Sequence, residues 1–262
     1  MYHTMKTIIF YLCLLISSFV SAEDWGKTGH RVVGEIAAQH LTKKTQRAIK
    51  KLLEGKSLAY VSTYADEVKS DANYKKYSPW HYVNLPLDKE YKDVVPPEQG
   101  DIVQALNFCI AQLQKKQLSR ADKIFALTFL IHLVGDAHQP LHVGKKEDRG
   151  GNRHDVKWFG KNSNLHRVWD SEMINSYGMS YSELANNLVP IFASINPALS
   201  EQLNPLVWIQ ESQNAVRTIY ANTPQNSQLG YDYSYQYFPL VQKRLYQAGI
   251  RLAALLNQIF DA

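Results

Sequence analysis

Histidine and aspartate pairs spaced four residues apart are the most chemically informative feature of this sequence. One pair is His132 and Asp136, and the other is His166 and Asp170. On a helix, residues i and i+4 project from the same face, so each pair can hold one metal ion or two adjacent ions. A single pair is weak evidence, but the occurrence of two pairs in one chain predicts a metal site.

The surroundings of Asp136 support this interpretation. The residue lies in the otherwise apolar segment 131–142. Burial of an unpaired carboxylate is costly, so Asp136 needs a cation or strong hydrogen-bond donors. The alternative is a His–Asp hydrogen bond that only stabilises the fold. Because His142 follows directly after the helix stop at Pro140, we favour a cation.

A second acidic residue is paired in sequence with a lysine. Asp66 and Lys69 are three residues apart in a predicted helix, so both can point into one site. Taken alone, this spacing is more typical of an ion pair on a solvated helix surface.

The segment 80–86 predicts a short extended stretch. Side chains alternate along such a stretch, so Tyr82 and Asn84 share one face while His81 points to the other. This arrangement suits a site in which one residue binds metal and its neighbours line a pocket. The alternative for Trp80 and Tyr82 is ordinary core packing.

Helical periodicity dominates the elements that must position these residues. The apolar spacing and the capping residues predict helices over 28–41, 57–68, 101–114, 122–139, 180–188, 205–220 and 238–260. The glycine-rich segment 143–164 predicts a loop, with a short hairpin around 154–159. No repeat or linker divides the chain. We therefore expect an all-α fold, in which residues 25–262 form a single mostly helical domain with at most a small β-hairpin.

Composition sets broad limits on function. The 262 residues are 45% hydrophobic and 20% charged, which excludes a disordered chain or a membrane bundle. The net charge of +5 favours polyanionic partners, although an ordinary solvated surface explains it equally well because the lysines and arginines are scattered. Cys109 is the single cysteine after residue 22, so no internal disulfide is expected in a mature chain.

The first residues predict export. Lys6 precedes the apolar stretch 7–20, and small residues end at Ala22. This is typical of a signal peptide over residues 1–22, or 1–24 if cleavage falls later. No later segment is long and apolar enough to span a membrane. We therefore expect a secreted or periplasmic protein.

Several ordered motifs together resemble the trinuclear-zinc, single-strand-specific nucleases, which include fungal zinc nucleases and plant bifunctional type I nucleases. Zinc phospholipase C resembles the chain more distantly. The motifs are Trp25-Gly26-x2-Gly29-His30, Ala65-Asp66-x2-Lys69, Trp80-His81-Tyr82, His132-x3-Asp136-x-His138-Gln139-Pro140-Leu141-His142, Gly150-Gly151-Asn152 and Asn164-Leu165-His166-x2-Trp169-Asp170. A C-terminal stretch from 242 to 257 also resembles the last helix of that family, so the resemblance covers essentially the whole mature chain.

The resemblance implies three zinc ions per chain. The first would be held by Asp66, His81, His132 and Asp136, the second by His142, His166 and Asp170, and the third by His30, Asp136 and the backbone of Trp25. Asp66 would orient the attacking water, and Lys69 would stabilise charge on the phosphate. The nucleobase pocket would contain Tyr82, Asn84, Gly151 and Asn152, with Arg149 stacking on a base. The resemblance gives no ligand role to His40, His138 and His154, and we expect them at the surface or behind the metal ligands.

The implied reaction is hydrolysis of single-stranded DNA and RNA by attack of zinc-bound hydroxide. It would leave 5′-phosphates, and the same site would act on 3′-nucleotides. We expect a monomer with no stable protein partner. One alternative is a zinc phospholipase C, against which the motifs around Trp80 and Gly150 favour the nucleases. Another is a non-catalytic periplasmic zinc-binding protein, for which Lys69 and a base pocket would have no use.

The predicted cleavage site conflicts with the implied third zinc. Cleavage after Ala22 leaves Glu23 and Asp24 ahead of Trp25, whereas the family uses a free amine on that tryptophan. An amide nitrogen has no available lone pair, but an α-amine can lose its proton and bind zinc. We therefore expect the active form to begin at Trp25.

Overall fold

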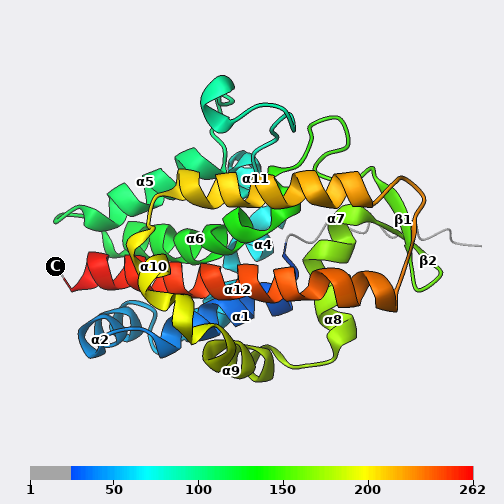
Figure 1. Cartoon of the computed structure of the whole chain (residues 1–262). Coiled ribbons are helices and arrows are strands. Elements are labelled where there is room, and N and C mark those ends of the chain that lie inside the picture. Colours follow the sequence, from blue (N-terminus) through cyan, green and yellow to red (C-terminus); the bar gives the residue numbers. More distant parts are fainter. Residues whose placement is uncertain (1–24, 262) are drawn as a thin grey trace, which may run out of the picture.

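Helix α6 (Arg120–His138) lies at the centre of the computed structural model, which describes residues 25–261. Residues 126–138 are all buried, because α5 (Ile102–Gln114), α11 (Pro205–Asn222) and α12 (Tyr231–Phe260) pack around α6 (Figure 1). The predicted signal peptide lies outside the described residues.

A second group of helices packs on the other side of α12. Here α1 (Lys27–Gln39) contacts α12, α9 (Tyr181–Phe192) and α3 (Leu58–Val61) (Figure 1). The remaining helices are α2 (Lys43–Leu52), α4 (Tyr64–Glu67), α7 (Leu165–Arg167), α8 (Met173–Tyr177) and α10 (Asn196–Glu201). The 3₁₀-helices are η1 (Val68–Ser70), η2 (Ala72–His81), η3 (Tyr91–Asp93), η4 (Pro140–Val143) and η6 (Ala193–Ile195). The segment η5 (Val168–Glu172) is a π-helix.

The predicted hairpin forms between β1 (Asp155–Trp158) and β2 (Lys161–Asn164), which are antiparallel with Asp155 opposite Asn164. A third strand, β3 (Gln228–Leu229), pairs in parallel with β1. This two-residue strand was not predicted because it is too short to show alternation. The mostly helical fold with a small sheet confirms the predicted fold class.

Several helix boundaries differ from prediction. The helix predicted over 57–68 divides into α3, α4 and η1, and the break falls where the carbonyl of Ser62 accepts a hydrogen bond from His132 Nδ1. Thr28 is not the cap of α1, since the helix begins at Lys27 and the Thr28 hydroxyl donates to Asn175.

The last helix begins at Tyr231, seven residues before the predicted start, and Pro239 lies inside it. Its first turns are held by buried Tyr233, whose hydroxyl accepts a hydrogen bond from Trp169 Nε1 at 2.9 Å. Helix α2 was not predicted, because its ten residues include few apolar ones and only Thr45 and Ile49 are buried. Within residues 25–261, no helix has the length and apolar character needed to cross a membrane.

Candidate metal centre and adjoining pocket

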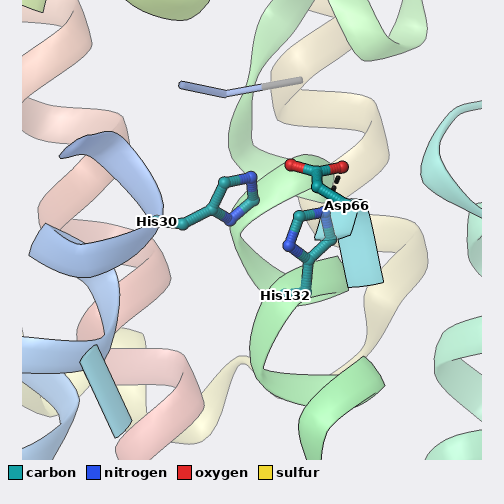
Figure 2. A group of neighbouring side chains, drawn as sticks. All are labelled: His30, Asp66 and His132. Carbon is teal, nitrogen blue, oxygen red and sulfur yellow. Dashed lines mark ion pairs between the residues drawn. The ribbon is translucent and has the colours of Figure 1, made fainter. Parts of the chain in front are cut away.

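Eight histidine and aspartate side chains converge at one place beside the C-terminal half of α6. They come from α1, α4, η2, α6, η4, α7 and η5, and they are His30, Asp66, His81, His132, Asp136, His142, His166 and Asp170. Figure 2 shows three of them, with His30 and Asp66 directed toward the space above the His132 ring. The structure therefore brings together every histidine and aspartate that the sequence predicted as a metal ligand.

The first group of donor atoms surrounds Asp136. Its Oδ2 lies 2.9 Å from His81 Nδ1 and 3.1 Å from His132 Nε2. Asp66 Oδ1 lies 3.4 Å from His132 Nε2 and 3.8 Å from His81 Nδ1. Ligands bound about 2.1 Å from a tetrahedral ion are separated by roughly 3.4 Å. The four distances around Asp136 and Asp66 are therefore close to those between ligands of one metal ion.

The second group lies where η4 meets the segment formed by α7 and η5. His166 Nε2 is 2.9 Å from Asp170 Oδ2, and His142 Nε2 is 3.6 Å from Asp170 Oδ1. The two imidazole rings are stacked with their centroids 5.1 Å apart. The helical spacing of His166 and Asp170 thus produces the contact predicted from it.

The third group is built around His30. Its Nε2 lies 3.3 Å from Asp136 Oδ1, and its ring stacks on His132 at 3.8 Å between centroids. A Cβ atom added at Gly135 would lie 2.8 Å from His30 Nδ1, so α6 can approach α1 here only with glycine at that position. Trp25 is buried, and the next residue, Gly26, donates its amide to the carbonyl of Asp170. The Trp25 backbone therefore lies beside the cluster.

Three histidines are held in fixed orientations by backbone carbonyls. The Nδ1 atoms of His132, His142 and His166 lie 2.7, 2.7 and 2.6 Å from the carbonyl oxygens of Ser62, His81 and Gly150. A carbonyl can only accept, so each Nδ1 carries a proton and each Nε2 is the ring nitrogen that faces the cluster. This is the usual support for histidines that bind metal.

Several buried donor and acceptor atoms lack a hydrogen bond. Among the described residues these include Asp136 Oδ1, Asp170 Oδ2, His166 Nε2 and both ring nitrogens of His30. His166 Nε2 lies 2.9 Å from Asp170 Oδ2, a contact that needs a proton or a metal ion between the two atoms. Mixed imidazole and carboxylate donors in this geometry fit zinc.

The histidines and aspartates of the cluster shift one another's pKa values. Burial raises the pKa of Asp136, but His132 and His142 outweigh burial and hold that pKa well below its usual value. Burial lowers the pKa of His132, yet Asp136 and Asp66 raise it to about 10. The cluster therefore stabilises positive charge in its centre, as a proton or as a metal ion.

Lys69 lies beside the cluster. Its Nζ is 2.8 Å from Asp66 Oδ1, and the two side chains are 30% and 21% exposed, whereas His30, His132 and Asp136 are fully buried. Burial lowers the pKa of Lys69 to about 8, although Asp136 and Asp170 act in the opposite direction. The predicted ion pair therefore exists, and it lies at the exposed edge of the cluster.

A cavity of about 590 Å³, called the base pocket below, adjoins His142 and His166. Its other lining residues are Tyr82, Asn84, Leu141, Arg149, Gly150, Asn152, Asn164 and Arg167. The extended stretch predicted over 80–86 begins only at Tyr82, because Trp80 and His81 are the last residues of η2. The predicted alternation is nevertheless observed, with Tyr82 exposed and His81 and Val83 buried. Four of the five predicted pocket residues thus line the cavity.

Gly151 does not line the base pocket. It is buried and donates its amide to Asp148 Oδ1 at 2.9 Å, inside a turn in which Arg149, Gly150 and Gly151 all have positive φ. A Cβ atom at Gly150 would overlap the carbonyl oxygen of Leu141. The two glycines therefore shape the turn whose Gly150 carbonyl orients His166.

Other residues acquire roles that their sequence pattern did not indicate. The Gln139 side-chain amide donates to Asp170 Oδ1, while its Oε1 accepts from the amide of Leu141. Arg167, in α7, also lines the base pocket. The one sequence feature that could have indicated this is its position next to His166. The histidines without predicted ligand roles remain outside the cluster and bond to carbonyls of Ile36, Val134 and Thr223; they are His40, His138 and His154.

Comparison with known proteins identifies related sequences over the same range. The family model described as S1/P1 nuclease matches residues 25–261. Endonuclease 4 of Arabidopsis thaliana is 36% identical over 271 aligned positions, which cover 91% of this chain and 90% of that protein. Endonuclease 2 of the same plant is 31% identical and covers 94% of each. Nuclease S1 of Aspergillus oryzae is 26% identical, and the alignment covers 90% of this chain and 91% of that protein.

Proposed function

The chain belongs to the S1/P1 nuclease family, a family of zinc-dependent enzymes, and from this premise we propose that it hydrolyses single-stranded DNA and RNA to products with 5′-phosphates. The same site would release phosphate from 3′-nucleotides. The observation that carries the proposal is the contact between the metal cluster and the base pocket, since His142 and His166 belong to both.

The proposed zinc sites follow the three groups of donor atoms. Asp66, His81, His132 and Asp136 would hold one ion, and His142, His166 and Asp170 a second. His30, the free Oδ1 of Asp136 and the Trp25 backbone would hold a third. Bound zinc supplies Lewis acidity and brings the pKa of a water ligand to about 7.

Asp66 and Lys69 are proposed to act on the substrate directly, because they are the partly exposed members of the site. The Asp66 carboxylate would accept a hydrogen bond from the attacking water and so fix its orientation. The Lys69 ammonium would lie against the phosphate oxygens, where it stabilises the negative charge that develops in the transition state. Neither role requires either side chain to move far from the observed ion pair.

The base pocket supports a preference for single strands. Tyr82 exposes 40% of its surface and offers a ring on which a base can stack, while the amides of Asn84 and Asn152 can bond to base edges. A base can enter such a pocket only when it is already unstacked and unpaired. Arg149 and Arg167 add positive charge at the lining, which suits the phosphates of the strand.

Two other kinds of protein would use a metal cluster of this composition. A zinc phospholipase C would need an apolar surface beside the ions, but polar and charged side chains predominate in the base pocket. A zinc-storage protein would need no Lys69 beside the cluster. We also propose export, with an active chain that begins at Trp25, because the next residue, Gly26, donates its amide to the carbonyl of Asp170 and so brings Trp25 close to the cluster. Intact-mass measurement of the exported protein tests this start.

The activity can be tested by incubating the zinc-loaded protein with single-stranded DNA, single-stranded RNA, duplex DNA, 3′-AMP and phosphatidylcholine. We expect rapid cleavage of both single strands, products with 5′-phosphates, and release of phosphate from 3′-AMP. Cleavage of phosphatidylcholine alone would identify a phospholipase. A zinc-loaded protein that acts on none of these substrates would contradict the proposed function.

A further inference from the structure

A second pocket adjoins the base pocket. Its volume is about 440 Å³, and it shares Tyr82 and Asn84 with the base pocket. Its lining also includes Val95, Pro96, Pro97, Asp101 and Lys146. The two pockets therefore adjoin at one short extended segment.

The second pocket shares no residue with the metal cluster, whereas the base pocket contains His142 and His166. The base pocket therefore connects the two, because it shares these histidines with the cluster and Tyr82 and Asn84 with the second pocket. A ligand that extends beyond the base pocket past Tyr82 and Asn84 meets the second pocket next.

The lining has the chemistry that a nucleotide requires. Val95 is 94% exposed and stands beside Pro96 and Pro97, which together present apolar surface that a planar base can cover. Lys146 is exposed at the same pocket and supplies positive charge for a phosphate.

The acidic residue in the second pocket does not oppose this assignment. The carboxylate of Asp101 accepts hydrogen bonds from the hydroxyl of Tyr91 at 3.0 Å and from the amides of Val103 and Gln104 at 3.0 and 3.2 Å. Its side chain caps α5, and the residue is only 2% exposed. The negative charge is therefore engaged by the protein, and Lys146 determines the charge that the pocket shows to a ligand.

We propose that the second pocket binds the nucleotide immediately 5′ of the one in the base pocket, with Lys146 contacting the phosphate that joins them. This proposal rests on the proposed nuclease function. When products carry 5′-phosphates, the nucleotide in the base pocket leaves through its 3′ oxygen, so its 3′ side faces the cluster. Its 5′ side then points away from the cluster, toward Tyr82 and the second pocket.

The trinucleotide ApApA tests this assignment within one molecule. Cleavage of its second bond gives ApA and pA, and requires an upstream nucleotide in the second pocket. Cleavage of its first bond gives A and pApA, and leaves that pocket empty. Chromatography of the early products gives the ratio of second-bond to first-bond cleavage. Because both cleavages occur at the same zinc site, this ratio does not change with the fraction of protein that is folded and loaded with zinc.

Two variants change the second pocket without touching the cluster. Lys146→Glu reverses the charge offered to the phosphate, and Val95→Asp places a carboxylate on the apolar wall. We expect each to lower the ratio of second-bond to first-bond cleavage by about fivefold, as is typical of one partly exposed charge contact. Lys89→Glu is the matched control, because this exposed lysine lines neither pocket, and its ratio should equal that of the unaltered protein.

Each other outcome has a definite meaning. Unchanged ratios in both Lys146→Glu and Val95→Asp would overturn the second-pocket proposal while leaving the nuclease function intact. Selective loss of first-bond cleavage would overturn it as well, since the pocket would then hold a downstream nucleotide. If the unaltered, zinc-loaded protein cleaves neither bond, the proposed function itself fails.

Discussion

His132 Nε2 lies 3.1 Å from Asp136 Oδ2, and both residues are fully buried one turn apart on α6. The Nδ1 of the same imidazole is fixed by the carbonyl of Ser62, so the ring cannot turn away from the carboxylate. Asp136 also contacts His30 and His81. Two of the three proposed zinc sites therefore depend on one carboxylate, which lies in the buried part of α6.

Replacement of either residue should remove metal and destabilise the protein. We expect His132→Ala and Asp136→Ala to lose zinc and to lower the melting temperature by roughly 10 °C, because the free energy of metal binding contributes to folding. Elemental analysis and thermal unfolding measure both effects. In excess chelator the difference from the unaltered protein should shrink. His40→Ala, a histidine outside the cluster, serves as the control and should keep its zinc.

Lys69 separates catalysis from metal binding. Its ammonium pairs with Asp66 at 2.8 Å and cannot itself bind zinc while it is protonated. Lys69→Ala should keep a normal zinc content and lose turnover by about a hundredfold, as is typical of one transition-state contact. Steady-state kinetics with single-stranded DNA, together with elemental analysis, provide the test. Turnover equal to that of the unaltered protein would show that Lys69 has no catalytic role.

Much of this site could be predicted from the sequence because its ligands lie at helical spacings. His132 and Asp136 belong to one strongly apolar helix, and His166 and Asp170 to another helical segment, so local periodicity places each pair on a common face. The order of the motifs then supplied Asp66 and its neighbours. Helical spacing and each single motif involve only residues that are close together in the chain.

The parts that were missed depend on contacts between distant segments. Gln139 reaches Asp170 across 31 positions, and no local pattern indicates that contact. Gly151 was expected in the base pocket, but the consecutive positive φ angles around it turn its amide toward Asp148 instead. The early start of α12 depends on the hydrogen bond between Tyr233 and Trp169, and no local sequence pattern indicates that contact either.

Gln139 should act as a positioning residue for the second group. Its side-chain amide donates to one oxygen of Asp170 and so leaves the other, Oδ2, directed at His166. Gln139→Leu should weaken zinc binding at His142, His166 and Asp170 by about tenfold, as is usual when the support of a ligand is lost. Competition with a zinc chelator measures this affinity. Binding indistinguishable from that of the unaltered protein would exclude the role.

Zinc binding should depend on pH with a definite sign. In the metal-free cluster Asp136 and Asp66 outweigh burial and raise the pKa of His132 to about 10, so this imidazole holds a proton at neutral pH. Zinc must displace that proton, and its apparent affinity should therefore rise with pH, by about tenfold per unit if one proton is released. Isothermal titration calorimetry in buffers of different ionisation enthalpy counts the protons. An affinity that falls as pH rises would contradict the assigned charges.

The central claim is that the three donor groups hold the zinc on which cleavage of single strands depends. The most direct test measures zinc content and activity on one preparation, before chelation, after chelation and after zinc is restored. We expect about three zinc ions per active chain, loss of cleavage of single-stranded DNA when they are removed, and recovery when zinc returns. A metal-free preparation that cleaves single strands at the full rate would contradict the account.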